Sequence, residues 1–264
     1  MSKQGYVWVG LALAAGCAEP GAAQVEGRDL DQFTIFDGSV PTTPEHEAVV
    51  SISTFKKPKK NYYCSGTLIE PDVVLTAAHC LDEAGAFAAN FNEVETTDVK
   101  VGFGDFAGTA VYMQVSDVEI NPGYDRQSLG VDDLGLLRLN QDAEVAFGIV
   151  AVPNLPLALL LQDPADVGAT IDFGGYGTNN TPDIKGTKLQ VFGTIDTINA
   201  TDIEYSQVAG GPCSGDSGGP AFIDRSGVKY VAGVTSWGSA ACDGAGSFGV
   251  SVTPDVYEAW ITAF

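Results

Sequence analysis

Short runs of β-forming residues, separated by turn residues, fill the chain from Ile35 onward. Such runs are rich in Val, Ile, Thr, Phe and Tyr and are bounded by Gly, Pro, Asn and Asp, as in EAVVSIST, GTLIEPDVVLTAA, TAVYMQVSDVEI and KYVAGVTSW. Runs of this length and composition are typical of β-strands. The pattern therefore predicts an all-β fold built from many short strands.

The last residues, TPDVYEAWITAF, depart from this pattern. Thr253 is expected to cap a helix with Pro254 at its first position, since both residue types favour a helix start. Val256, Trp260 and Ile261 then recur at helical spacing. We expect a C-terminal helix that docks on the sheet.

Composition narrows the possible functions. The chain has 264 residues, 45% hydrophobic and 18% charged, which suits a packed domain rather than a disordered chain. Acidic residues outnumber basic ones by 34 to 13, for a net charge of −21. Such a surface repels phosphates and anionic lipid, so we expect no nucleic-acid partner and no electrostatic membrane binding. The basic patch FKKPKK (55–60) is expected to be a solvated loop between two strands, with an anionic partner as the alternative.

Residues 1–34 are typical of an export signal followed by a linker or pro-segment. Lys3 precedes the apolar run VWVGLALAAG, which is too short to span a bilayer, and no later segment looks transmembrane. LAAGC resembles a bacterial lipobox, which would place a lipid on Cys17, whereas cleavage after Ala18 or Ala23 is the alternative. We expect a protein outside the cytoplasm, either secreted or lipid-anchored through Cys17.

Cysteine usage agrees with export. Once Cys17 is assigned to the leader, four cysteines remain, and an even set in an oxidising compartment suggests two disulfides with three possible pairings. A zinc site is the alternative, but the chain has no CxxC pair and only two histidines. We therefore expect no metal and no other cofactor.

Three segments carry candidate catalytic residues. The hydroxyl of Ser217, in GPCSGDSGGP, needs a neutral imidazole to accept its proton and a carboxylate to orient that imidazole. His46 lies between two glutamates, a setting that fits an exposed loop, whereas His79 ends the apolar run VVLTAAHC. Asp133 leads into the apolar run of VDDLGLLRLN, where a carboxylate is costly to bury unless it is paired.

Together these segments resemble the trypsin/chymotrypsin family of serine peptidases. LTAAHC, DLGLLRL and GDSGGP are similar to the family's histidine, aspartate and serine motifs and occur in the same order. CSGTLI, GYG and SWG extend the resemblance over residues 35–264. It implies one peptidase domain there, made of two antiparallel six-stranded β-barrels with a C-terminal α-helix.

The resemblance also implies roles for individual residues. His79 would act as general base and then general acid, Asp133 would orient it, and Ser217 would attack the substrate carbonyl. Asp132 fits less well than Asp133, because the family motif places its aspartate directly before the apolar residue. The backbone N–H groups of Gly215 and Ser217 would form the oxyanion hole.

In the family, a new N-terminus created by cleavage pairs with the aspartate before the catalytic serine. The equivalent residues are Ile35 and Asp216, so the resemblance implies activation by a cut between Thr34 and Ile35. Phe36 and Asp37 differ from the family's usual start, and a cut after threonine is uncommon. The disulfides implied are Cys64 with Cys80 and Cys213 with Cys242.

The pocket for the residue before the cleaved bond, the P1 residue, is expected to be uncharged, because the position of the family's pocket aspartate is Gly211. An apolar P1 residue is therefore expected, with a basic one as the alternative if Asp243 enters the pocket. Residues 236–238 would pair with the substrate backbone as an added strand. The substrate-binding residues implied are Gly211, Ser236, Trp237, Gly238 and Gly249.

These inferences predict a monomeric serine endopeptidase that acts on proteins or peptides. A catalytically inactive homologue that serves as an extracellular binding protein is one alternative. A β-rich adhesion domain is another, but it would not explain the three motifs.

Overall fold

The computed structural model describes residues 35, 38–56, 60–82, 93–125, 131–152, 154–155, 164–177, 186–239, 242 and 244–264. These residues belong to one compact unit, Gln32–Phe264. The predictions on the leader, on Cys17 and on Asp243 lie outside the described residues, as do Thr34, Phe36 and Asp37.

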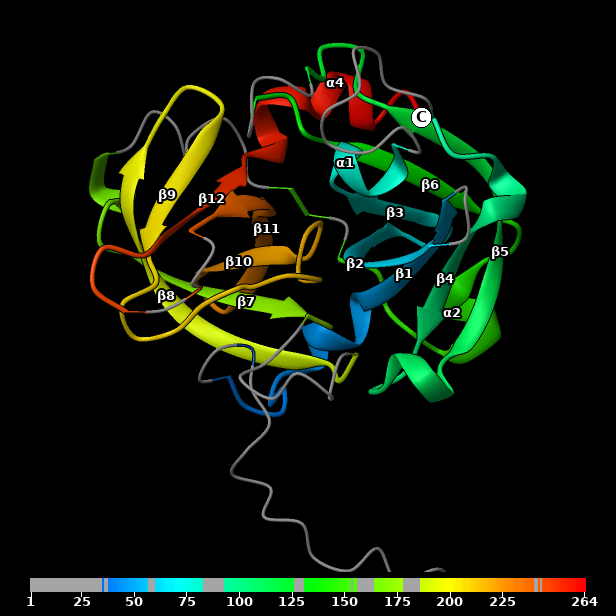
Figure 1. Cartoon of the computed structure of the whole chain (residues 1–264), viewed down its shortest axis with the longest axis horizontal. Coiled ribbons are helices and arrows are strands. Elements are labelled where there is room, and N and C mark those ends of the chain that lie inside the picture. Colours follow the sequence, from blue (N-terminus) through cyan, green and yellow to red (C-terminus); the bar gives the residue numbers. More distant parts are fainter. Residues whose placement is uncertain are drawn as a thin grey trace, which may run out of the picture. The chain divides into compact units, whose positions relative to one another are not determined.

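The described strands form two closed antiparallel β-barrels of six strands each, which confirms the fold expected from the sequence (Figure 1). The first barrel has the order β1-β2-β3-β6-β5-β4 and the second β10-β11-β12-β9-β8-β7. The first contains β1 (Val49–Lys56), β2 (Lys60–Glu70), β3 (Val73–Thr76), β4 (Val99–Phe103), β5 (Val111–Ile120) and β6 (Gly135–Leu139). The second contains β7 (Thr170–Gly175), β8 (Leu189–Ile198), β9 (Asp202–Ser206), β10 (Pro220–Arg225), β11 (Val228–Gly238) and β12 (Phe248–Val252).

The helices among the described residues are short. The α-helices are α1 (Ala78–Leu81), α2 (Ala143–Phe147) and α4 (Glu258–Ile261). The 3-10 turns are η2 (Pro44–Ala48), η3 (Thr96–Asp98), η4 (Ala107–Thr109), η5 (Pro164–Asp166) and η6 (Pro254–Tyr257). None of the described helices has the length and hydropathy needed to cross a bilayer.

Strand burial follows from barrel closure. β3 lies between β2 and β6, and all four of its side chains are buried. β5 has a mixed pattern in which Met113 and Val115 point inward between exposed neighbours. Closing each sheet on itself pairs the edge strands and buries the inner faces. The larger of the two core clusters contains the first-barrel core and extends to Phe222, Val231, Val234 and Val252 of the second barrel.

The C-terminal segment returns from the second barrel to the first. After β12, η6 contacts β11 of the second barrel, and α4 lies over the first barrel (Figure 1). Ile261 of α4 belongs to the core cluster that contains the first-barrel residues, and Trp260 packs against it. The Trp260 indole also donates to Glu119 Oε1 of β5 at 2.6 Å. The predicted helix is therefore present, with Pro254 in its first turn, but it begins as a 3-10 turn and the Thr253 side chain makes no capping hydrogen bond.

His46 is buried, so the expectation of an exposed loop histidine was wrong. Its exposed fraction is 1%, and Nε2 lies 3.3 Å from Asp172 Oδ1. Nδ1 contacts the Thr43 hydroxyl at 3.0 Å, and the ring packs edge-on against Phe222. The flanking glutamates suggested a solvated loop, but the ring is buried beside the Asp172 carboxylate of β7.

The basic patch begins and ends inside strands. Phe55 and Lys56 end β1, Lys60 begins β2, and Lys56 pairs with Lys60 across the hairpin. Residues 57–59 between them lie outside the described residues. The loop expected at 55–60 is therefore shorter than predicted.

Tyr176 lies where the two barrels meet. It follows β7 of the second barrel, yet its buried hydroxyl donates to the Gly104 carbonyl at 2.5 Å and lies 3.1 Å from the Val49 carbonyl. Its backbone N–H donates to the Ser65 hydroxyl of β2 at 2.9 Å. The Tyr176 hydroxyl of the second barrel is thus a hydrogen-bond partner for two backbone carbonyls of the first barrel.

We predict that Tyr176→Phe lowers the free energy of unfolding by about 1–3 kcal/mol, because buried carbonyl groups lose their donor. Tyr112→Phe is the matched control. The Tyr112 hydroxyl also donates to a backbone carbonyl, that of Ala107, but Tyr112 is 37% exposed, so water can replace the bond. Urea unfolding of both variants measures the difference, and equal losses would contradict a special role for Tyr176.

Candidate active site

The candidate site lies between the two barrels and takes residues from both. His79 is in α1, directly after β3, and Asp133 lies two residues before β6. Ser217 lies in the loop between β9 and β10 of the second barrel. Ser65 of β2 donates its backbone N–H to the Ser217 carbonyl at 2.8 Å, which holds that loop against the first barrel.

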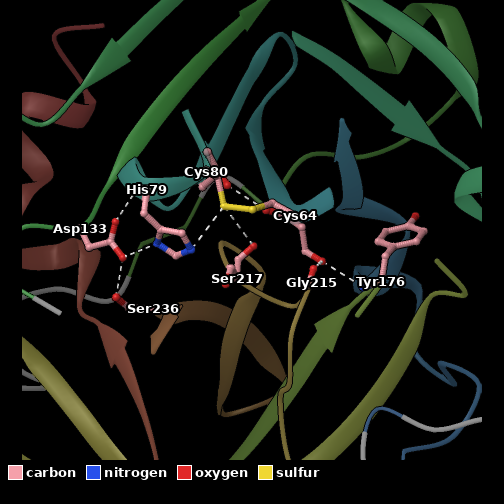
Figure 2. Close-up of a disulfide and its surroundings, with 10 residues drawn as sticks. Cys64, His79, Cys80, Asp133, Tyr176, Gly215, Ser217 and Ser236 are labelled. Carbon is pink, nitrogen blue, oxygen red and sulfur yellow. Dashed lines mark hydrogen bonds and ion pairs between the residues drawn. A yellow bond between two sulfur atoms is a disulfide. The ribbon is translucent and has the colours of Figure 1, made fainter. Parts of the chain in front are cut away.

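His79 and Asp133 are joined by two hydrogen bonds. His79 Nδ1 lies 2.8 Å from Asp133 Oδ2, and the His79 backbone N–H donates to Oδ1 at 2.9 Å (Figure 2). The Ser236 hydroxyl of β11 donates the third hydrogen bond of this carboxylate, to Oδ2 at 2.5 Å. Asp133 is only 3% exposed, whereas the His79 side chain is 34% exposed.

Burial alone would raise the pKa of Asp133, because a charged carboxylate loses its hydration. The positive charge of His79 and the hydrogen bonds from His79 and Ser236 outweigh that effect and hold the pKa below its usual value. The ionised carboxylate is therefore the favoured form. It orients the imidazole so that Nδ1 carries a proton and Nε2 can accept one.

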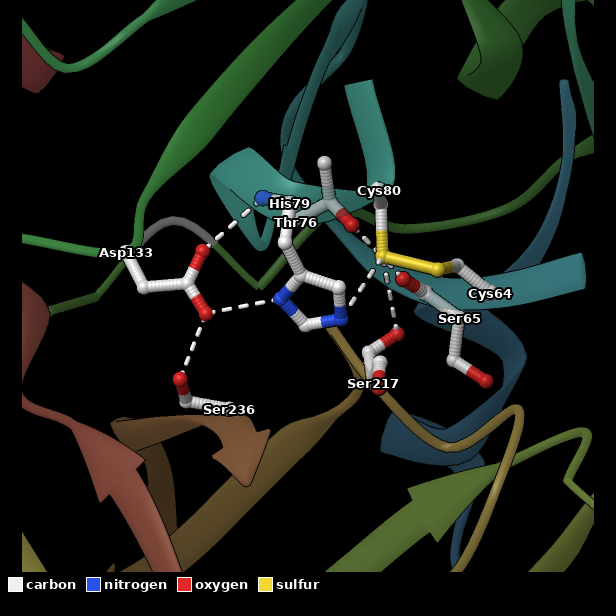
Figure 3. Close-up of polar contacts among 8 residues, drawn as sticks. All are labelled: Cys64, Ser65, Thr76, His79, Cys80, Asp133, Ser217 and Ser236. Atoms are coloured by element: carbon white, nitrogen blue, oxygen red, sulfur yellow. Dashed lines mark hydrogen bonds and ion pairs between the residues drawn. A yellow bond between two sulfur atoms is a disulfide. The ribbon is translucent and has the colours of Figure 1, made fainter. Parts of the chain in front are cut away.

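Ser217 lies on the Nε2 side of the imidazole, opposite Asp133 (Figure 3). Cys80 Sγ is 3.8 Å from His79 Nε2 and 3.6 Å from the Ser217 carbonyl oxygen. The arrangement brings the three residues of the sequence motifs together in the order Asp133, His79, Ser217 (Figure 2).

The loop that carries Ser217 depends on glycine at two positions. Gly215 and Gly218 have φ of +100° and +82°, a region that other residues rarely adopt. A Cβ at Gly218 would also lie 2.1 Å from Thr76 Oγ1 and 2.4 Å from the Ser65 carbonyl. Glycine thus lets the backbone pass directly over β2 and β3.

Several amides of this loop hold its shape by hydrogen bonds to backbone carbonyls. Asp216 N–H donates to the Cys213 carbonyl at 2.9 Å, and Gly218 N–H donates to the Thr235 carbonyl at 2.7 Å. Within the described part of the chain, the amides of Gly215 and Ser217 donate to no backbone carbonyl. Both therefore remain able to donate to a bound oxygen.

Two disulfides brace the site, and their pairing is the one implied by the family resemblance. Cys64 joins Cys80 beside His79 (Figure 2). Cys213, in the Ser217 loop, joins Cys242. Cys64, His79 and Cys80 are the group of possible metal ligands found among the described residues. Because both of its sulfurs are in a disulfide, this group offers no thiolate to a metal.

Asp216 is 1% exposed and lies behind the Ser217 loop. Its carboxylate accepts from the N–H groups of Gly177 and Cys213 at 2.7 and 2.8 Å. Burial raises its pKa to about 7, and these two hydrogen bonds lower it only in part. No Lys, Arg or His side chain in the described ranges pairs with it. Ile35 is buried in the core of the second barrel.

A cavity of about 240 Å³ opens beside Ser217, and we call it the primary pocket. Its wall includes three of the predicted residues, Ser236, Trp237 and Gly238. Gly211 and Gly249 are not in its wall, because Gln207 covers the first and the Tyr205 ring covers the second. The sequence interpretation missed Gln207 and Tyr205. Their position just before the GGPCSGDSGGP loop was the available signal.

The sequence model of the family described as Trypsin matches residues 35–261, which is most of the chain. CLIP domain-containing serine protease B4 from Anopheles gambiae is 26% identical, covering 85% of this chain and 68% of its own length. Brachyurin from Leptuca pugilator is 29% identical, covering 77% and 85%. Vitamin K-dependent protein C from Rattus norvegicus is 27% identical, covering 78% and 47%, so the chain spans about half of that relative.

We predict that Gly218→Ala costs more stability than Gly227→Ala, although both glycines have φ near +83°. Nothing lies within 4 Å of a Cβ at Gly227, so that variant carries only backbone strain of about 1–2 kcal/mol. Gly218→Ala adds a clash with Thr76 and Ser65, for a total of about 3 kcal/mol or more. Denaturant unfolding compares the two, and equal losses would show that the loop can move away from β2.

Proposed function

The chain belongs to the trypsin family of serine peptidases, and from that premise we propose that it is an active serine endopeptidase with the triad His79, Asp133 and Ser217. The observation that carries the proposal is the hydrogen bond between His79 Nδ1 and the buried Asp133 carboxylate, which leaves Nε2 facing Ser217. A serine hydroxyl becomes a useful nucleophile only when such a base accepts its proton.

The reaction proceeds by acyl transfer in two halves. His79 Nε2 takes the Ser217 hydroxyl proton as the oxygen attacks the substrate carbonyl, and then passes that proton to the leaving amine. In the second half, His79 takes a proton from water as the water oxygen attacks the acyl-enzyme, and returns that proton to Ser217 as the acid product leaves. Asp133 stabilises the imidazolium formed in each half, because its ionised carboxylate lies 2.8 Å from Nδ1.

The N–H groups of Gly215 and Ser217 form the oxyanion hole in this proposal. Their freedom from backbone partners in the described part of the chain supports that role. Each such donor contributes about 3 kcal/mol to transition-state stabilisation in enzymes of this chemistry. The +100° φ of Gly215 is then a requirement of the reaction as well as of the fold.

The substrate lies along β11. Ser236 to Gly238 form the end of that strand, and an extended peptide can pair with them as an added strand, with Trp237 as an apolar platform. The primary pocket takes an uncharged P1 residue, because no acidic side chain is among the residues of its wall in the described ranges. The apolar preference expected from the sequence relied on Gly211, Gly238 and Gly249, and of these only Gly238 belongs to the pocket wall.

Asp216 is the residue on which the proposed activation depends. A cut between Thr34 and Ile35 would create an ammonium group at Ile35. The buried Asp216 carboxylate, whose pKa is raised, would be stabilised in its ionised form by such a cation. The protein acts outside the cytoplasm, as its two disulfides support, either secreted or anchored through a lipid on Cys17 until the cut removes it. We propose a monomer that acts on proteins or peptides without a metal or other cofactor.

We predict that a fluorophosphonate probe labels the processed wild-type protein and fails to label Ser217→Ala. The probe reacts covalently only with an activated serine, so it reports the triad independently of any substrate preference. Ser214→Ala is the control, because it removes a neighbouring hydroxyl and leaves Ser217. Absence of labelling in correctly processed wild type would favour the alternative, an inactive homologue that acts as a binding protein.

We predict that the uncut precursor loses stability as the pH rises from about 4 to 7. Over that range Asp216 is ionised in the unfolded chain but protonated in the folded one, because its folded pKa is raised to about 7. The loss amounts to about 4 kcal/mol, from roughly 1.4 kcal/mol per pKa unit.

The test uses Ser217→Ala protein to prevent self-cleavage, with urea unfolding from pH 4 to 8. Asp216→Asn should remove this part of the pH dependence from the precursor. Protein released from a fusion that ends directly before Ile35 should also lack it, because the ammonium group lowers the pKa of Asp216. If the precursor and the released protein share one pH profile, the proposed pairing is wrong.

A further inference from the structure

Gln207 is a buried residue of the primary pocket wall, next to Gly211. It follows β9 directly, is 2% exposed and belongs to the pocket wall. A Cβ at Gly211 would lie 2.9 Å from both Cγ and Nε2 of Gln207. The glutamine side chain therefore occupies the space that the missing side chain of Gly211 leaves.

The orientation of the Gln207 amide is set by one contact. Nε2 donates to the Pro212 carbonyl at 2.5 Å, and a carbonyl oxygen can only accept. The opposite assignment would place two oxygens against each other, so Oε1 must be the atom that points away from Pro212. Oε1 finds no hydrogen-bond donor among the described residues, although it is buried.

This unpaired oxygen faces the pocket at Gly238. A Cβ added to Gly238 would lie 3.2 Å from Gln207 Oε1 and 3.1 Å from the Gly249 Cα. Gly238 and Gly249 are paired across β11 and β12. The Tyr205 hydroxyl lies at the same pair of glycines, 2.6 Å from the Cβ position of Gly249. The pocket wall therefore includes a residue with an unpaired acceptor at Gly238 and a residue with a hydroxyl, which can donate, at Gly249.

A buried acceptor without a donor is costly, and a ligand that supplies the donor recovers that cost. A carboxylate on the P1 residue would repel Oε1. A lysine or arginine would lose its hydration without gaining a carboxylate from the pocket wall in the described ranges. A carboxamide supplies an N–H for Oε1 and a carbonyl for the Tyr205 hydroxyl, and it brings no charge.

We propose that Gln207 makes the primary pocket selective for a P1 carboxamide, asparagine or glutamine, over an apolar side chain of the same size; this rests on the peptidase activity proposed above. The family resemblance implied that glycines determine which P1 residue the pocket accepts. The selective group is instead the amide oxygen of a residue four positions before Gly211.

The experiment compares matched peptide substrates with the enzyme released directly before Ile35. Asparagine against leucine and glutamine against methionine at P1 are pairs of similar size that differ in the donor. We expect kcat/KM for each carboxamide to exceed that of its apolar partner by about tenfold or more, since a site built to hydrogen-bond discriminates against an analogue without the group. Equal or better cleavage of the leucine and methionine peptides would overturn the proposal.

Variants of Gln207 test whether this residue causes the P1 preference. Gln207→Leu should lower the ratio of kcat/KM for the asparagine peptide to that for the leucine peptide by about tenfold, because the acceptor for the carboxamide is lost. Gln114→Leu makes the same replacement at an exposed position of β5 and should change neither value. Gln207→Glu keeps an acceptor and adds charge, so it should raise cleavage after lysine. A Gln207→Leu enzyme with an unchanged substrate ratio would contradict the role of Gln207.

Fluorophosphonate labelling separates this proposal from the one it depends on. If wild type is not labelled, the peptidase function itself is wrong. If wild type is labelled but prefers the apolar peptides, only the role of Gln207 fails. Should Gln207→Leu not be labelled because its loop is disturbed, the wild-type comparison of asparagine with leucine still decides the question.

Discussion

The ionised carboxylate of Asp133 is the group on which the arrangement of the site depends. An ionised group this deeply buried is stable only when it is paired and hydrogen-bonded. Here the donors are the ring and backbone of His79 and the hydroxyl of Ser236. Ser236 belongs to the second barrel, whereas Asp133 and His79 belong to the first. Satisfying this one charge therefore requires both barrels to be in place.

Hydrogen bonds between the two barrels also hold the Ser217 loop itself. The Ser65 hydroxyl of β2 donates to the Gly215 carbonyl at 3.0 Å and accepts from the Tyr176 amide at 2.9 Å. Ser65 also donates its own amide to the Ser217 carbonyl. A first-barrel strand thus fixes the backbone on each side of Asp216. The geometry of the loop is a property of the barrel interface rather than of its glycines alone.

The sequence predicted the all-β fold and the motif residues of the site, because both can be recognised from residues that are neighbours in the chain. Alternating β-forming runs and turn residues sufficed for the all-β fold, and the motifs around His79 and Ser217 identified two residues that the fold brings together. His46 was misjudged because its environment is set by Asp172 and Phe222, which are distant in sequence. Gln207 was missed for a related reason. Its position just before the GGPCSGDSGGP loop placed it near the site, but did not show that its side chain lies against Gly211 and Gly238. A glycine marks a missing side chain, but only the fold shows whether a neighbour fills the space.

Asp133 and Asp216 show how one residue type can serve two purposes in the same site. Both are buried, and both accept hydrogen bonds from backbone amides. The pKa of Asp133 is lowered because the charge of His79 and the added hydrogen bonds outweigh burial, whereas that of Asp216 is raised to about 7 because two amides alone do not. The difference lies in the partner: His79 can take up a positive charge beside Asp133, and Asp216 has no such side chain among the described residues. Asp216 therefore depends on a charge from elsewhere, and a newly formed chain end can deliver that charge without any new side chain.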